Sequence, residues 1–116
     1  MSDFPGNPFF DSDGDNTAQA MKAGAGFLYS LEVSNPNSAD AYLQLFDAAT
    51  GSVTVGSTTP ALSLLVPAGN GTQDGGMDKF WSGGVIFNTA ITYACTTTAT
   101  GNTDPTTGLV VNAVVG

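Results

Sequence analysis

The fold class is decided by the stretch GFLYSLEVSNPNSADAYLQLFD, residues 26–47. One face of its first nine residues carries Phe27, Tyr29, Leu31 and Val33, and the residues between them form a mixed face. This period of two is typical of a half-buried β-strand. The following NPNSAD, residues 35–40, consists of turn formers. Residues 41–47 then predict a second strand that is covered on both faces, because apolar side chains occur on both.

Four further runs have the same strand-like character. They are ALSLLVPAG (61–69), MDKFWSGGVIFN (77–88), AITYACTTT (90–98) and LVVNAVV (109–115). The segment 48–60 is either a loop or a short edge strand around Val53 and Val55, since glycines interrupt it on both sides. No window has a convincing helical period, so we expect little helix, with one turn over residues 16–22 as the only candidate.

Many short strands separated by turn signals predict an all-β protein. We expect a β-sandwich of about eight short antiparallel strands, jelly-roll-like in its connections. A small barrel is the alternative. The order of the strands within the sheets cannot be deduced from a single sequence, because it depends on pairings between distant segments.

The chain of 116 residues has the length of one domain. Its beginning differs from the rest, because it combines prolines, aspartates and three phenylalanines without any strand-like alternation. We therefore predict an extended N-terminal arm over residues 1–23 and a sandwich domain over residues 24–116.

The charge balance restricts the partners. Ten acidic residues stand against two lysines, with no arginine and no histidine, and the net charge is −8. Binding to nucleic acid draws its affinity from cationic side chains, so we expect no nucleic-acid partner. Anionic membrane surfaces are disfavoured for the same reason. No apolar run approaches the roughly 20 residues that span a bilayer, so we expect no membrane partner either.

The acidic stretch FFDSDGDNTAQ, residues 9–19, has alternating aspartates that resemble the start of a calcium loop. Asp11, Asp13 and Asp15 are accordingly weak candidates for metal ligands. An EF-hand loop requires a glycine at its sixth position and a glutamate at its twelfth, where this chain has Asn16 and Lys22. We therefore predict no metal site, and we interpret the stretch as a solvated acidic segment.

The chain has few residues of the types that enzymes use for catalysis. The lack of histidine removes the usual nucleophile and base pairs, and the lack of arginine removes a bidentate anion clamp. A carboxylate pair from Glu32, Asp40 and Asp47 is conceivable, but Glu32 fits a solvent-facing strand position and both aspartates fit turns. The single cysteine, Cys95, fits a core position. We expect no enzyme and no cofactor.

The aromatic residues offer two kinds of partner contact. Phe4, Phe9 and Phe10 lie in the predicted arm, where they either insert into a partner or pack on the sandwich. Trp81 precedes a Ser-Gly-Gly sequence at a predicted strand end, a place where exposure to solvent is expected. An exposed aromatic cluster could also stack on sugar rings, whereas most strand aromatics are expected to fill the core.

Several segments together resemble a family of small structural proteins from tailed bacteriophages. They are GFLYSLEVSNPNSADAYLQLFDAA, TTPALSLLVPAG, FWSGGVIFNTAITYACTTT and LVVNAVV, which lie between residues 24 and 115. None of these motifs is catalytic, and the segment through Asp15 lies outside the shared region.

The resemblance implies a virion β-sandwich of the capsid decoration, or cement, type. It would bind the major capsid protein on the outer capsid surface and stabilise the shell. A homotrimer is expected, with a homodimer as the alternative, because binding on a symmetry axis repeats one weak contact. The competing hypothesis is a receptor- or glycan-binding module of a head or tail fibre.

Overall fold

The computed structural model describes residues 6–116. The strands are β1 (Asn7–Gly14), β2 (Gln19–Lys22), β3 (Gly26–Asn35), β4 (Ala41–Phe46), β5 (Leu62–Val66), β6 (Gly75–Phe87), β7 (Ile91–Thr96) and β8 (Leu109–Val115). A short 3-10 helix, η1 (Thr50–Ser52), lies in the connection between β4 and β5. That connection is therefore a loop rather than an edge strand.

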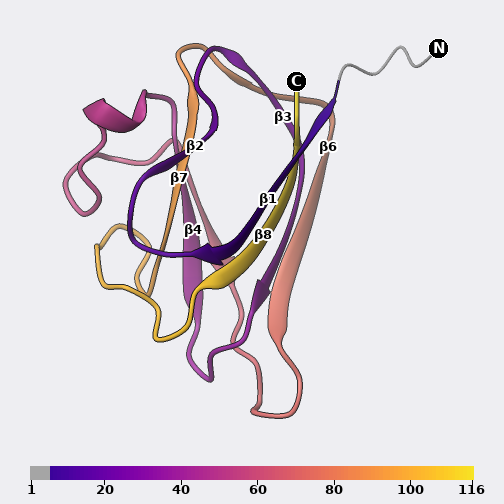
Figure 1. Ribbon diagram of the computed structural model, residues 1–116, viewed down its shortest axis with the longest axis vertical. Helices are drawn as coiled ribbons and strands as arrows, with labels where there is room; N and C mark the ends of the chain where they lie inside the picture. The colour runs from indigo at the N-terminus through magenta and orange to yellow at the C-terminus, as the bar shows by residue number, and fades with distance from the viewer. Residues whose placement is uncertain (1–5) are drawn as a thin grey trace.

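The strands form two four-stranded antiparallel sheets (Figure 1). Sheet A has the order β1-β8-β3-β6, and sheet B has the order β2-β7-β4-β5. The pairs are nested, so that β1 pairs with β8, β2 with β7, β3 with β6 and β4 with β5. The predicted all-β sandwich is confirmed.

The core lies between the inner faces of the two sheets. Its fully buried side chains include Leu31, Val33, Leu43, Leu45, Tyr93 and Val111. The two strands of the deciding stretch, β3 and β4, contribute to it from opposite sheets. The turn between them is therefore a corner that passes from one sheet to the other and not a hairpin.

A bulge in β3 changes which side chains point inward. Against β8, Leu28 pairs with Val115 and Ser30 pairs with Val114, so Tyr29 is an extra residue in β3. Before the bulge Leu28 is the buried residue and Phe27 is exposed, whereas after it Leu31 and Val33 are buried. The predicted apolar face was therefore wrong at Phe27, because an inserted residue reverses the alternation.

The predicted arm over residues 1–23 is wrong for the part that the structure describes. β1 pairs with β8 along sheet A, and β2 pairs with β7 along sheet B. The expected helical turn over residues 16–22 is likewise replaced by β2. β1 lacks apolar alternation because its inward-facing positions include Asp11, which accepts a hydrogen bond from the Tyr93 hydroxyl. Residues 7–22 thus belong to the sandwich.

Loops cover much of the outer face of sheet B. Gln44 and Thr92 point away from the core and are nevertheless fully buried. The Gln44 amide donates to the Gly101 carbonyl at 3.0 Å, and the Thr92 hydroxyl donates to the Ala48 carbonyl at 2.6 Å. The connections after β4 and after β7 therefore lie over this sheet, as Figure 1 shows on the side away from sheet A.

Candidate functional site

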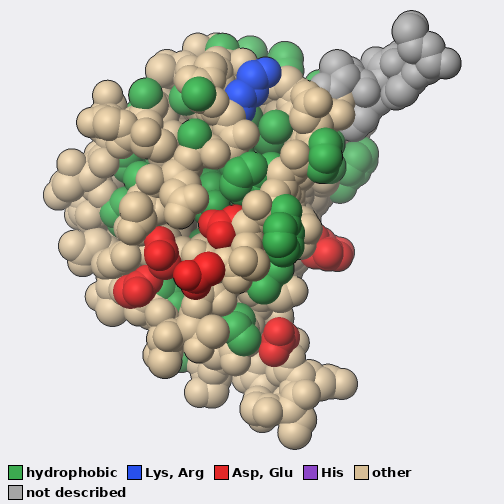
Figure 2. Space-filling view, viewed as in Figure 1, with side chains coloured by type: hydrophobic (Ala, Val, Ile, Leu, Met, Phe, Trp, Pro, Cys, Tyr) green, Lys and Arg blue, Asp and Glu red, His purple; other side chains and the backbone are tan. Residues whose placement is uncertain are grey.

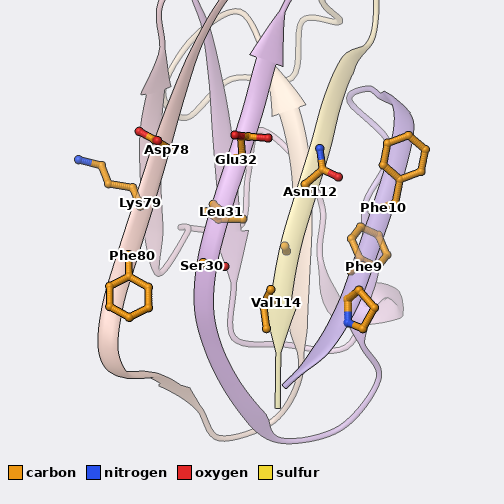
Figure 3. A pocket seen from close by; sticks show the side chains of 12 residues that line it. Phe9, Phe10, Ser30, Leu31, Glu32, Asp78, Lys79, Phe80, Asn112 and Val114 are labelled. Carbon is orange, nitrogen blue, oxygen red and sulfur yellow. The ribbon is translucent and has the colours of Figure 1, made fainter. Parts of the chain in front are cut away.

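The outer face of sheet A carries a groove of about 580 Å³. No loop within residues 6–116 lines this groove, whose residues come from the four strands themselves. Its outward-facing lining residues form two rows across the sheet. One row is Phe10, Asn112, Glu32 and Asp78, and the next is Pro8, Val114, Ser30 and Phe80. We call this feature the sheet A groove (Figure 3).

Two aromatic rings flank the sheet A groove. Phe10 on β1 is 63% exposed and Phe80 on β6 is 74% exposed. They stand on opposite sides, with Glu32 and Asn112 between them (Figure 3). Phe27 and Ile86, which pair further along β3 and β6, are also exposed. Clustered exposure of large apolar side chains is typical of an interaction surface.

The middle of the groove is acidic. Glu32 and Asp78 are direct cross-strand partners, and neither forms an ion pair within residues 6–116. The neighbouring Lys79 pairs with Leu31 and also lines the groove at its β6 edge, where its side chain extends outward past the strand and away from Glu32 (Figure 3). Figure 2 shows the same imbalance more widely, since acidic groups are prominent and basic groups sparse on that view. The groove therefore offers uncompensated negative charge between two apolar sides.

Comparison with protein-family models finds no match, and comparisons with curated proteins and with solved structures find none either. Within residues 6–116 no helix is long and apolar enough to cross a membrane.

The structure separates the residues that were predicted to contact a partner. Phe10 lies on the outer face of sheet A and lines the groove. Phe9 points inward, and its ring packs edge-on against Tyr93 with 5.5 Å between the ring centroids. Trp81 is half-buried and packs on the core, so its predicted exposure is wrong. Phe4 lies outside the described residues.

Trp81 faces inward because it alternates with the outward-facing Phe80, and a bulge in β6 begins there. Between the pairs Ser30–Phe80 and Leu28–Val85, four β6 residues stand against one residue of β3. Gly83 and Gly84 within this bulge have positive φ values of 84° and 83°, a conformation that glycine adopts without steric cost. The Ser-Gly-Gly sequence thus marks a bulge inside the long strand rather than its end.

The acidic stretch is a structural connection. The Asp11 carboxylate accepts from the Tyr93 hydroxyl and from the Asp13 amide, and the Asp15 carboxylate accepts from the Thr17 amide at 2.9 Å. No group of three potential ligands within residues 6–116 could hold a metal ion. The candidates Asp11, Asp13 and Asp15 therefore do not form a site, because two of them organise the path from β1 to β2.

The carboxylates that were considered for catalysis are not gathered into one pocket. Asp40 accepts from the Ala68 amide at 2.9 Å. Asp47 accepts from the amides of Asn88 at 3.0 Å and Thr89 at 2.8 Å, and these bonds lower the pKa of its carboxyl. Both aspartates thus organise turns, as their sequence positions predict. Glu32 alone lines the groove.

Cys95 is a core residue. Its side chain is completely buried, and burial raises the pKa of the thiol, with a further contribution from nearby carboxylates, chiefly Asp11. Burial likewise raises the pKa of the Tyr93 hydroxyl, and the hydrogen bond to Asp11 adds to this. Neither group is prepared for nucleophilic chemistry, because the thiolate and the phenolate are both disfavoured.

Phe80 lines the groove but is not among the predicted contact residues, because most strand aromatics are expected to fill the core. A signal for its exposure is present. Phe80 follows Asp78 by two residues on one strand, and alternate residues of a strand share a face. A face that carries Asp78 in solvent therefore carries Phe80 beside it.

Proposed function

We propose that this chain is a non-catalytic structural protein of a phage virion, and that it decorates the outside of the head and stabilises it. The observation that carries the proposal is the asymmetry of the sandwich. Loops cover much of the outer face of sheet B, whereas sheet A presents the aromatic groove uncovered within residues 6–116. A β-sandwich with one prepared face fits a protein that acts by attachment to a surface.

The strand connections support the same proposal. The nested pairing of β1 with β8 through β4 with β5 favours the jelly-roll type of sandwich, in which one long antiparallel ribbon is folded over. The sequence resemblance to phage structural proteins covers β3 to β8 and leaves out β1 and β2. The partner would be the major capsid protein, and the location would be the outer capsid surface.

A homotrimer would suit this role. Copies joined around a capsid symmetry axis bind through several weak contacts at once, which raises their combined affinity without a large interface per copy. A homodimer on a twofold axis is the alternative.

Loss of particle stability tests the proposal. Particles assembled with and without this chain would be heated, and release of their nucleic acid would be followed by a fluorescent dye. We expect release at a lower temperature without the chain, and restoration when purified protein is added back. Equal release temperatures would contradict a stabilising role.

A second function is favoured by the lining of the groove. Ser30, Glu32, Asp78 and Asn112 supply hydrogen-bonding groups between two exposed rings, which is also the chemistry that holds a sugar chain. A glycan array probed with the wild-type protein and with the Phe80→Ser variant tests this. Specific binding that the variant loses would favour a receptor-binding module over capsid attachment.

A further inference from the structure

We infer that the sheet A groove binds an extended protein segment with a basic side chain between two apolar ones. The cation would lie over Glu32 and Asp78, and the apolar side chains would contact Phe10 and Phe80. That the segment belongs to a capsid subunit rests on the function proposed above. The chemistry of the segment rests on the groove alone.

The carboxylates specify the charge of the occupant. Glu32 and Asp78 are directly opposite each other on adjacent strands, an arrangement that is unfavourable in the free protein. A neutral or acidic occupant would remove water from both carboxylates and give nothing in return. A lysine or arginine compensates both, and arginine suits the place better because its planar group also stacks on aromatic rings.

The width of sheet A determines the spacing of the contacting side chains along the bound segment. Three strand-to-strand steps separate β1 from β6, which is about 14 Å. In an extended segment, side chains on one face recur about every 7 Å. Three such side chains therefore cover the distance between Phe10 and Phe80, and the middle one lies between β8 and β3, beside Glu32, while Asp78 lies one strand further on, next to Phe80. An apolar-x-basic-x-apolar pattern fits this geometry.

A second copy of this chain fits the groove less well. A twofold contact between two such faces would place Glu32 and Asp78 against carboxylates of the same kind. Each copy also has a net charge of −8 and only two lysines. Self-association through sheet A would therefore concentrate negative charge, which a partner of opposite charge avoids.

Peptide titration followed by NMR tests the inference. The full-length protein, labelled with nitrogen-15, would be titrated with the capped peptide LSRSL, and the matched peptides LSESL and LSQSL would serve as controls. We expect LSRSL to shift the amide signals of Phe10, Ser30, Glu32 and Phe80, with a Kd on the order of 1 mM. Equal binding of LSESL, or shifts confined to other faces, would overturn the inference.

Amino-acid substitutions test whether the peptide binds in the sheet A groove. Glu32→Gln combined with Asp78→Asn should weaken LSRSL binding about fivefold, and Phe80→Ser should weaken it by a similar factor. Asp74→Asn and Leu65→Ser remove an acidic group and an exposed apolar group outside the groove, and they should leave the Kd unchanged. Unchanged binding in the groove variants, with their spectra otherwise intact, would overturn the inference.

Dilution of the free protein distinguishes self-association through the groove from binding of a basic segment. If a second copy covers the groove, the Phe80 signal will move with protein concentration in the absence of peptide, and that result would overturn the assignment to a basic segment. A Phe80 signal that is independent of concentration supports the assignment.

Capsid shells separate this inference from the proposed function. If the shells bind the wild-type protein and the groove variants equally, the proposed decoration function still holds, but the groove is not the surface that contacts the capsid. If the wild-type protein binds LSRSL in its groove but does not bind the shells, the proposed decoration function is wrong and the inferred specificity of the groove still holds.

Discussion

Glu32 on β3 and Asp78 on β6 are direct partners across the outer face of sheet A. Two like charges at such positions reduce the stability of the sheet. Glu32 lies between Phe10 and Phe80, and Asp78 lies beside Phe80 on β6. The charges and the exposed rings together thus prepare a surface for a cationic partner. Stability of the free chain and affinity for the partner thus make opposite demands on these positions.

Glu32→Gln should therefore stabilise the free protein. We expect the free energy of unfolding to rise by about 0.5 kcal/mol at low salt, and the gain to shrink at high salt because ions screen exposed charges. Urea unfolding at two salt concentrations measures this, with Asp74→Asn as a matched loss of one charge outside the pair. A variant that is less stable than the wild type at low salt would contradict a destabilising repulsion between Glu32 and Asp78.

Asn35→Ala should destabilise the sandwich strongly. Asn35 is completely buried at the corner between the sheets, where its amide donates to the carbonyls of Ala39 and Val66. Removing it leaves buried carbonyls without a donor, so we expect a loss of about 2 kcal/mol or more in the free energy of unfolding. Urea unfolding measures the loss. Asn112→Ala, on the outer face, should change stability by less than about 0.5 kcal/mol, and equal effects would refute the corner's role.

Asp47 should make stability depend on pH. Its pKa is lowered in the folded state from an ordinary value of 3.8, chiefly by the Asn88 amide, so its stabilising contribution is complete above about pH 4 and is lost as the pH falls through the folded value. Asp47→Asn should lower the free energy of unfolding by about 1 kcal/mol at pH 7. Unfolding at pH 7 and at pH 2.5 measures both. A difference from the wild type that persists undiminished at the lower pH would contradict this role of the charge.

The Cys95 thiol should be inert in the folded protein. Because it is buried and its pKa is raised, a thiol-reactive disulfide reagent at pH 8 should modify it about a hundredfold more slowly than in 6 M urea. Absorbance of the released thiolate follows the reaction. Complete modification of the native protein at the denatured rate would show that the strand β7 opens readily.

The strands themselves could be predicted because their signal is local. β8 coincides with the run LVVNAVV, and its buried residues alternate along it. β4 is covered on both faces, as its apolar residues on both sides indicated. Alternation describes how one segment meets the core, and it needs no knowledge of the partner strand.

Three features could not be predicted, because each depends on a partner that is distant in the sequence. The reversal at Phe27 depends on Tyr29, which is an extra residue of β3 against its neighbour β8. The inward position of Asp11 depends on the Tyr93 hydroxyl, which satisfies a carboxylate that would otherwise favour solvent. The groove depends on the order of strands that places Phe10 and Phe80 across one sheet.

Decoration of a phage head requires many copies of this chain on each particle, because a closed shell repeats the same attachment site over its whole surface. Quantitative mass spectrometry of purified particles, with isotope-labelled peptides of this chain and of the major capsid protein as standards, measures that number. We predict hundreds of copies in a fixed ratio to the capsid protein. A handful of copies per particle would place the chain at a vertex or on the tail and would contradict capsid decoration.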